Sequence, residues 1–262
     1  MNFILDFQKA TYPYFEELNE GVTKHIPPTK QDEAILDIGA GRGILSAHLK
    51  KLGYKTYIIE ANPSIAEQAR HHADYGICAD LHDIEKIKLV LQNKKFKYII
   101  FSDVLEHVFD PVQVLRNYQP FLSNHGKVIV SLPNVANWLV RLRLMFGVFN
   151  YEMTGVMDRT HIRFFTFKSA KKMLETSTYI INKIDSTPFI VRAFLPIIKK
   201  MLSHSSDHYQ TKSIIESPYY QFYTKYIYPI EYGFSRLLPS LFSFRIILVA
   251  SNPGEENGQL NQ

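Results

Sequence analysis

The stretch "ILDIGAGRG", residues 35–43, indicates the fold, because an apolar run of strand length leads directly into three closely spaced glycines. Gly39, Gly41 and Gly43 allow the backbone to turn tightly and to approach a ligand without an intervening side chain. A helix that starts after this turn would present its free amides to the same ligand. The spacing is G-x-G-x-G, one residue shorter than the dinucleotide fingerprint. The stretch predicts a nucleotide-binding turn, and a purely structural turn is the alternative.

Apolar runs of strand length recur along the rest of the chain, separated by segments with helical spacing. They are EAILDIG (33–39), KTYIIE (55–60), GICAD (76–80), KYIIFSD (97–103), GKVIVSLP (126–133), YIINKID (179–185) and FRIILVAS (244–251). We expect the first five to be parallel strands buried on both faces. The helical segments ILSAHLKKLG and PSIAEQARHHADYG close with Gly53 and Gly76. This alternation predicts a doubly wound α/β sheet with seven strands and a Rossmann-like layout.

Residues 188–241 break the alternation, and we expect them to form a helical insertion before the last strand. Their first part, FIVRAFLPIIKKML, has the pattern of a basic amphipathic helix, and a tyrosine-rich part follows. The core would comprise residues 1–187 and 242–251, and the polar tail 252–262 is expected to be disordered. The insertion is interpreted as a lid, with a homodimer contact and a peripheral membrane surface as alternatives.

Composition sets limits on the class of protein. The chain has 262 residues, 46% of them apolar, so it can bury a substantial core. The single cysteine, Cys78, excludes a disulfide framework within the chain and fits a reducing compartment. We see no basic leader and no apolar stretch long enough to span a membrane, and therefore expect a cytoplasmic protein. The net charge of +5 is too mild to suggest nucleic acid as the main partner.

Carboxylates follow the second and third predicted strands. Glu60, expected to be a solvent-facing side chain, could accept hydrogen bonds from both hydroxyls of a ribose. Asp80 could accept one from the exocyclic amine of adenine. Because the carboxyl ends of parallel strands meet at one edge of a sheet, both acids would lie near the glycine turn. The three strand ends together predict an adenosine site.

Several motifs, in their order and spacing, resemble those of class I S-adenosylmethionine-dependent methyltransferases. They are ILDIGAGRG, YIIEANPSIAEQAR, CADL, YIIFSDVLEHVFDP and GKVIVSLPN. The resemblance covers roughly residues 32–184 and implies S-adenosyl-L-methionine as cofactor and a methyltransferase sheet as fold. The later segments NVANW and DRTHIRFFTFKSAKKMLE are similar to a bacterial subgroup related to ubiquinone-pathway O-methyltransferases, which includes enzymes that modify glycans or lipids.

The resemblance also implies roles for individual residues. Asp37 and residues 39–41 would line the methionine part of the cofactor, Glu60 would hold the ribose, and Asp80 with Leu81 would hold the adenine. The complete set of candidate cofactor-binding residues is Asp37, Gly39, Ala40, Gly41, Gly43, Glu60, Ala61, Asp80, Leu81 and Ser102.

Two acids and a histidine follow the fourth predicted strand, in YIIFSDVLEHVFDP (98–111). The activated methyl group is supplied by the cofactor, so the protein must orient an acceptor and manage its proton. An imidazole titrates near pH 6.5 and suits proton removal at cellular pH. We interpret His107 as a general base or acceptor-orienting group, assisted by His161, with Asp103 and Glu106 as further catalytic candidates. A histidine that only braces the sheet edge is the alternative.

The same residues offer a second hypothesis, a divalent-metal site. Asp103, Glu106 and His107 are spaced to share one face of a helical turn, and His161 could add a ligand from a distant loop. Some relatives, the small-RNA 2′-O-methyltransferases and ubiquinone-pathway O-methyltransferases, have a similar acid-x-x-Glu-His pattern and depend on metal. Asp103 stands where those enzymes have a glutamate, so the metal hypothesis is not the favoured one.

The loop 147–166 is interpreted as facing the substrate, because it brings together Tyr151, Asp158, Arg159, His161 and Arg163. The alternative is that Asp158 and Arg163 form an ordinary ion pair that fixes the loop. The favoured function is O-methylation of a hydroxyl on a small-molecule, glycan or lipid-linked acceptor. Three other readings stay open: an RNA 2′-O-methyltransferase, a non-catalytic cofactor-binding subunit, and a dinucleotide-dependent oxidoreductase. The sequence does not identify the acceptor.

Overall fold

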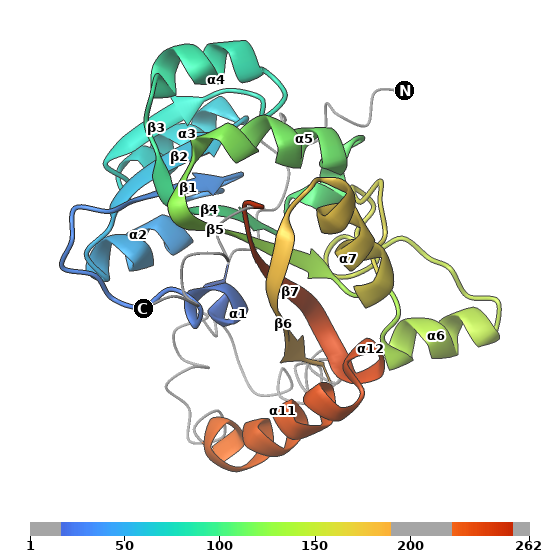
Figure 1. Ribbon diagram of the computed structural model, residues 1–262. Helices are drawn as coiled ribbons and strands as arrows, with labels where there is room; N and C mark the ends of the chain where they lie inside the picture. The colour runs from blue at the N-terminus through green and yellow to red at the C-terminus, as the bar shows by residue number, and fades with distance from the viewer. Residues whose placement is uncertain (1–16, 190–221, 254–262) are drawn as a thin grey trace, which may run out of the picture.

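The computed structural model describes residues 17–189 and 222–253, and a seven-stranded sheet forms its centre (Figure 1). The strands are β1 (Ala34–Ile38), β2 (Lys55–Glu60), β3 (Tyr75–Cys78), β4 (Phe96–Ser102), β5 (Leu122–Pro133), β6 (Ile180–Pro188) and β7 (Ser243–Ser251). Their order in the sheet is β3-β2-β1-β4-β5-β7-β6. Strands β1 to β5 are parallel, and β7 is antiparallel to β5 and β6. The predicted α/β Rossmann-like sheet is confirmed.

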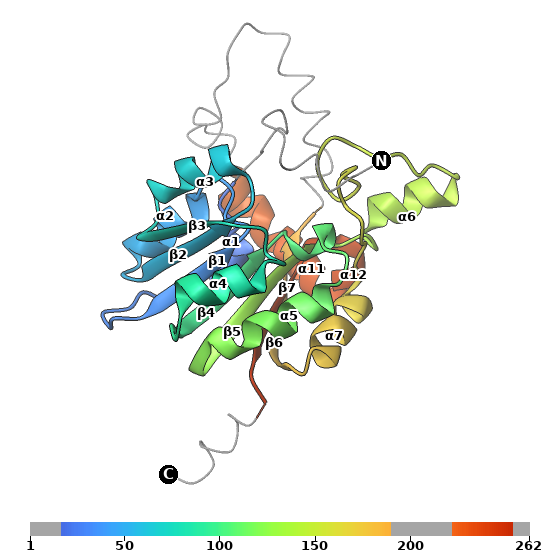
Figure 2. The same ribbon diagram turned by 90° about the horizontal axis from the view of Figure 1, so that it is seen from above.

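Helices cover both faces of the sheet (Figure 2). One layer consists of α1 (Glu20–Thr23), α2 (Ile44–Lys51) and α3 (Pro63–Arg70), and the other of α4 (Ile84–Leu91), α5 (Pro111–Tyr118) and α7 (Phe167–Thr176). In β4, Ile99 and Phe101 enter the core under α5, whereas Tyr98 and Ile100 enter the core under α2. This alternation of side chains explains why the strand is apolar throughout, since both of its faces are buried.

Strand β3 differs from the expectation that it is buried on both faces. It pairs only with β2 and forms an edge of the sheet, so Tyr75 is more than half exposed. Gly76 was expected to close the preceding helix, but it lies within β3, and α3 ends at Arg70. A Cβ atom at Gly76 would come within 2.5 Å of the Arg70 side chain. A larger residue here would therefore require the Arg70 side chain to move.

The described part of the insertion is helical. It contains a π-helical turn (Tyr223–Ile227), α11 (Tyr228–Leu237) and α12 (Pro239–Phe242), and α11 packs against β6. The amide of Phe189 donates to the carbonyl of Phe242 at 2.9 Å, so the two ends of the insertion are adjacent. Almost all of FIVRAFLPIIKKML, most of the tail and the first residues of the core lie outside the described residues. The division into core, insertion and tail stays a prediction.

The parallel strands deliver their carboxyl ends to one edge of the sheet, and the loops there carry the candidate site residues. After β5 the chain forms α6 (Trp138–Met145), which extends away from the sheet (Figures 1 and 2). Short 3-10 turns, Leu105–His107 and Gln119–Phe121, flank α5. None of the helices in the described ranges combines the length and apolar character needed to cross a bilayer.

Candidate active site

The glycine turn joins β1 to α2 in a conformation that favours glycine. Gly39, Gly41 and Gly43 have φ angles of 66°, 54° and 85°, in the left-handed region. The amide of Gly39 donates to the carbonyl of Ile59 at 2.8 Å, which holds the turn against the end of β2. A Cβ atom at Gly39 would lie 2.6 Å from the Val104 side chain. The turn is thus fixed between β2 and the loop after β4.

Glu60 is buried and fastens the glycine turn, in contrast to the expected solvent-facing side chain. Only 6% of its surface is exposed. One carboxylate oxygen accepts from the amide of Gly41 at 3.0 Å, and the other accepts from the amide of Asn62 at 2.9 Å. Burial raises the pKa of Glu60, and the amide hydrogen bonds partly offset this increase. Glu60 therefore has a structural role at the place where sequence reasoning expected ribose binding alone.

The other two strand-end acids differ in their surroundings. Asp37 is buried and accepts from the hydroxyl of Ser46 at 2.8 Å, which connects β1 to α2. Asp80 is more exposed; it accepts from the amide of His82 at 2.9 Å and pairs with its ring at 2.7 Å. The carbonyl of the neighbouring Leu81 accepts from the hydroxyl of Tyr118 at 3.1 Å. The structure brings the candidate cofactor residues of β1 to β3 to one edge of the sheet.

A polar network that the sequence did not predict lies at the ends of β4 and β5. Asn19 donates from its amide nitrogen to the hydroxyls of Ser102 and Ser131, at 3.0 and 2.9 Å. Ser131 donates in turn to Asp103 at 2.8 Å, and Arg245 of β7 donates to the same carboxylate at 2.7 Å. Asp103 has a φ angle of 55°, an uncommon value for a residue other than glycine. The network holds the residue in this conformation.

Residues of this network are far apart in the sequence, which is why pattern reasoning missed them. Asn19 lies 83 residues before Ser102, and Arg245 lies 142 residues after Asp103. The antiparallel pairing of β5 and β7 places Arg245 opposite Pro133, at the end of β5. The ion pair between Arg245 and Asp103 therefore depends on the tertiary fold.

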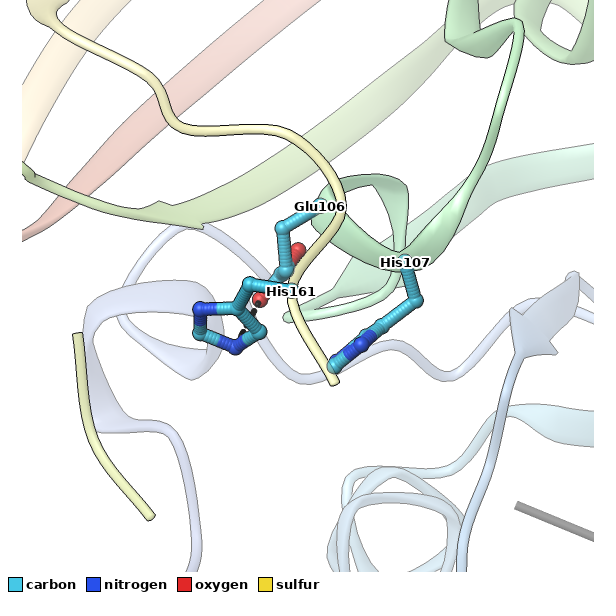
Figure 3. A group of neighbouring side chains, drawn as sticks. All are labelled: Glu106, His107 and His161. Carbon is cyan, nitrogen blue, oxygen red and sulfur yellow. Dashed lines mark ion pairs between the residues drawn. The ribbon is translucent and has the colours of Figure 1, made fainter. Parts of the chain in front are cut away.

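The acid and histidine cluster forms next to this network (Figure 3). Glu106 and His107 lie on the turn after β4, and His161 comes from the loop after α6. One potential ligand atom from each of the three side chains lies within 4.8 Å of the others. The backbone amides of Ile162 and Arg163 each donate to the carbonyl of Glu106 at 3.0 Å. These hydrogen bonds hold the two chain segments together.

Hydrogen bonds orient both imidazole rings. Nδ1 of His107 lies 3.2 Å from the carbonyl of Thr160, and Nδ1 of His161 lies 3.1 Å from the carbonyl of Val156. A carbonyl only accepts, so each Nδ1 carries the proton, and in the neutral ring the lone pair belongs to Nε2. Burial and the neighbouring His161 lower the pKa of His107 to about 4. Burial also lowers the pKa of His161, so both rings are neutral at pH 7.

Glu106 is the buried acid of the cluster. It is 1% exposed, and neither carboxylate oxygen has a hydrogen-bond partner among the described residues. Nε2 of the neutral His161 lies 4.0 Å from one of them, and Arg245, whose charge also acts on this carboxylate, is paired with Asp103. Burial and the nearby charge of Asp103 raise the pKa of Glu106 well above its usual value. A buried carboxylate is costly unless a positive charge faces it.

The donor set therefore fits a divalent cation. Two neutral imidazoles anchored through Nδ1, together with one carboxylate, are ligands that Zn²⁺ and related metals accept, and backbone carbonyls commonly orient such histidines. A cation would also favour the ionised form of Glu106, whose pKa burial raises. Of the four ligands proposed from sequence, Glu106, His107 and His161 come together, whereas the carboxylate of Asp103 is engaged by Ser131 and Arg245.

The loop that carries His161 is ordered by partners other than the expected Asp158–Arg163 pair. Asp158 is buried and accepts from the amide and the hydroxyl of Thr160, at 2.8 and 2.6 Å. Arg163 instead donates from Nε to the carbonyl of Phe109 at 2.8 Å. Asp158 thus shapes the turn that presents the Thr160 carbonyl to His107.

The fold and this arrangement of strand-end loops define a methyltransferase of the Rossmann-like class. Residues 11–178, more than half of the chain, match the family described as "Methyltransferase domain", and the protein belongs to that family.

Particular relatives were found by sequence. A ubiquinone biosynthesis O-methyltransferase of Coxiella burnetii is 28% identical over 134 residues, which are 50% of this chain and 57% of that protein. A protein of the same name from Cereibacter sphaeroides is 31% identical over 101 residues, 38% of this chain and 41% of that protein. The chain thus matches only about half the length of these relatives.

Solved structures show the same fold. A SAM-dependent methyltransferase from Archaeoglobus fulgidus has a TM-score of 0.56 and 18% identity, and the match covers 87% of this chain and 90% of that one. Phosphoethanolamine N-methyltransferase 2 from Haemonchus contortus, solved with S-adenosyl-L-methionine, has a TM-score of 0.52 and 15% identity, covering 88% and 51%. At these identities the likeness is evidence for the fold alone.

Proposed function

We propose that the protein is an S-adenosylmethionine-dependent O-methyltransferase whose acceptor hydroxyl binds at Glu106, His107 and His161. The observation that carries this proposal is the buried Glu106 carboxylate, which has no hydrogen-bond partner among the described residues and faces two oriented, neutral imidazoles at the carboxyl end of β4. The family match and the O-methyltransferase names of the sequence relatives support the reaction class. The acceptor we propose is a small or lipid-linked hydroxyl compound.

The cofactor would lie over the glycine turn and the ends of β2 and β3. Its sulfonium carries the methyl group, and in the reaction the carbon–sulfur bond breaks while a carbon–oxygen bond to the acceptor forms. The hydroxyl gives up its proton to solvent, or to His107 if that ring is the general base, and the cofactor leaves as the thioether S-adenosylhomocysteine. The protein contributes chiefly by aligning the two reactants. Holding them in line removes a large part of the activation barrier in such transfers.

We propose that Glu106, His107 and His161 hold a divalent cation. When bound, such a cation would lower the pKa of a hydroxyl that coordinates it and so favour the oxygen anion that attacks the methyl group. The carbonyls of Thr160 and Val156 accept from Nδ1 of the two rings, so in each neutral ring the lone pair that a metal needs is on Nε2. Asp103, three residues before Glu106, is not a ligand in this proposal because it forms an ion pair with Arg245.

Chelation and substitution separate this proposal from the hypothesis that His107 is a general base. His107→Gln should bind S-adenosylmethionine normally but lose at least about 10²-fold in rate under either reading. Only the metal reading predicts that the parent enzyme loses activity after chelation and regains it with added Mn²⁺, Mg²⁺ or Zn²⁺. Full activity in excess chelator would refute the metal site, and full activity of His107→Gln would refute both roles.

Metal binding also has a readout that needs no acceptor. Calorimetric titration of the metal-free protein with Mn²⁺ or Zn²⁺ should show one site, and Glu106→Gln should weaken it at least about tenfold because the only charged ligand is lost. Glu152→Gln is the matched control. Glu152 lies on the loop after α6, is paired with Arg143 of that helix and is not part of the cluster. Equal metal affinity in the parent and Glu106→Gln proteins would contradict the site.

A further inference from the structure

The segment from the end of α6 to Met153 exposes an unusual number of large apolar side chains. Those among the exposed large hydrophobics of the described residues are Leu142, Leu144, Met145, Phe146, Val148, Phe149, Tyr151 and Met153. We call residues 138–153 the apolar projection. Met145 and Phe146 are 73% and 72% exposed, so they contribute little to the core. A concentration of exposed apolar surface of this kind marks an interaction site.

The shape of the projection indicates what kind of partner it fits. In two perpendicular views α6 extends outward from the body of the protein rather than lying flat against it (Figures 1 and 2). Successive helical residues are rotated by about 100°, so Leu142, Leu144, Met145 and Phe146 point in several directions around the helix end. A flat protein partner would cover only one side of it. A lipid surface can surround such a tip on all sides.

Charge complements this apolar surface. Arg141 is exposed on α6, and Arg143 lies two positions further along the same helix, paired with Glu152. Arg159 and Arg163 are exposed on the loop that follows. Arginine side chains can keep their charged groups in the headgroup layer while their methylene stems remain among apolar side chains. The projection, with Arg141 on it and Arg159 on the loop that follows, therefore combines the two features of an interfacial segment that prefers anionic lipids.

We propose that the apolar projection is a peripheral membrane anchor that inserts into the surface of anionic lipid bilayers. This assigns membrane contact to residues 138–153, whereas the sequence pattern pointed to residues 188–241. Residues 154–161 follow the projection directly and end at His161. Attachment through the projection would thus hold the acidic and histidine cluster close to the lipid surface. The proposal does not depend on the reaction that the cluster performs.

Vesicle flotation of the full chain tests the proposal. Vesicles of equal parts phosphatidylglycerol and phosphatidylcholine should carry the protein, and vesicles of phosphatidylcholine alone should carry much less. The double variant Met145→Glu, Phe146→Glu should reduce the bound fraction at least about tenfold, because it removes apolar contacts and adds charge that anionic lipid repels. Unchanged thermal unfolding of the variant would show that the loss is not a folding defect.

Two matched controls locate the anchor. Leu89 on α4 and Leu237 on α11 are 78% and 77% exposed, so each can be replaced by glutamate without disturbing a core. Both single variants should float like the parent. The proposal is overturned if the parent does not float, if the double variant floats equally well, or if Leu237→Glu alone abolishes flotation. It is also overturned if the double variant dissociates a dimer in gel filtration while neither protein binds vesicles, because the partner would then be a second copy.

Discussion

Glu60 combines a structural contact with a predicted role in cofactor binding. Replacing it with glutamine leaves one acceptor oxygen for two backbone amides, and the new NH₂ group would face an amide donor. We therefore expect Glu60→Gln to weaken S-adenosylmethionine binding at least about tenfold and to lower the free energy of unfolding by about 1 to 3 kcal/mol. Calorimetry and urea unfolding measure the two effects separately.

The control for this substitution is Glu67→Gln on α3, where the carboxylate forms an exposed ion pair with Arg70. Such pairs contribute little, so neither binding nor stability should change by more than a few tenths of a kcal/mol. If Glu60→Gln left the stability unchanged, Glu60 would not fasten the glycine turn. If it left cofactor affinity unchanged, the ribose role would be wrong.

Stability measurements distinguish a metal-binding role of Glu106 from a structural one. Its carboxylate has no hydrogen-bond partner among the described residues, so Glu106→Gln should not lower the free energy of unfolding measured at pH 7 with a chelator present. Added Mn²⁺ or Zn²⁺ should stabilise the parent by about 2.7 kcal/mol at a hundred times its dissociation constant, and the variant far less. A loss above about 1 kcal/mol in the metal-free variant would contradict this account.

At the scale of elements, Asp185 joins α1, β6 and α11. Its carboxylate pairs with Lys24 at 2.9 Å and with His25 at 3.1 Å, and it accepts from the hydroxyl of Tyr232 at 3.2 Å. Burial by itself would raise the pKa of Asp185, but the hydrogen bonds from His25 and Lys24 and the charge of Lys24 lower it well below the usual value. The carboxylate is therefore ionised in the fold.

This lowered pKa predicts a pH dependence of stability. The unfolded chain binds a proton on this residue near pH 3.9, and the folded chain only at lower pH. Asp185 thus stabilises the fold above that value, and the contribution disappears as the pH falls toward the folded pKa. Asp185→Asn should be less stable than the parent at pH 7 by about 1 to 3 kcal/mol, and the difference should shrink below about pH 4.

Chemical unfolding from pH 7 to about pH 3 would measure the effect. Asp32→Asn provides the control, because Asp32 forms a well-exposed pair with Lys55 and should leave the pH dependence nearly unchanged. If the free energies of unfolding of the parent and Asp185→Asn differed by the same amount at all pH values, the contribution of Asp185 to stability would not depend on its ionisation.

At the scale of the whole molecule, β6 and β7 allow the insertion to be removed cleanly. Pro188 is the register partner of Ser243, and Phe189 bonds to Phe242, so the chain can be rejoined there. Replacing residues 190–241 with Asn-Gly would create a hairpin with a turn that suits antiparallel strands. The cofactor residues lie on β1 to β4 and the loops after them, so S-adenosylmethionine affinity should remain within about threefold, less than 1 kcal/mol.

Methyl transfer by the same variant tests the predicted lid. If residues 188–241 close over the acceptor, the rate should fall at least about tenfold because the acceptor is no longer held in line. The variant also removes the contact of Tyr232 with Asp185, and the Asp185→Asn protein shows how much of any loss arises from that contact. Transfer at the parent rate would mean that the insertion is no lid.

The strands, the glycine turn and the acids at the strand ends could be predicted from the sequence, because each depends on a pattern within about ten neighbouring residues. The run ILDIGAGRG, for example, contains both the buried strand and the glycines that its turn requires. His161 could be proposed as a partner of His107 from residue type alone. The distance between the two rings and their tautomers could not, because they depend on how the fold places the Thr160 carbonyl beside His107 and the Val156 carbonyl beside His161.

Contacts between distant segments were decided only by the tertiary structure. Local pattern fixes which face of a strand is apolar, but the neighbour of that strand depends on packing summed over the whole chain. Strand β3 is therefore an exposed edge, and β7 enters between β5 and β6. Arg245 consequently reaches Asp103 across 142 residues, and Glu60 turns inward to two amides rather than toward solvent. Glu106 is buried without a hydrogen-bond partner among the described residues, which sequence spacing does not reveal.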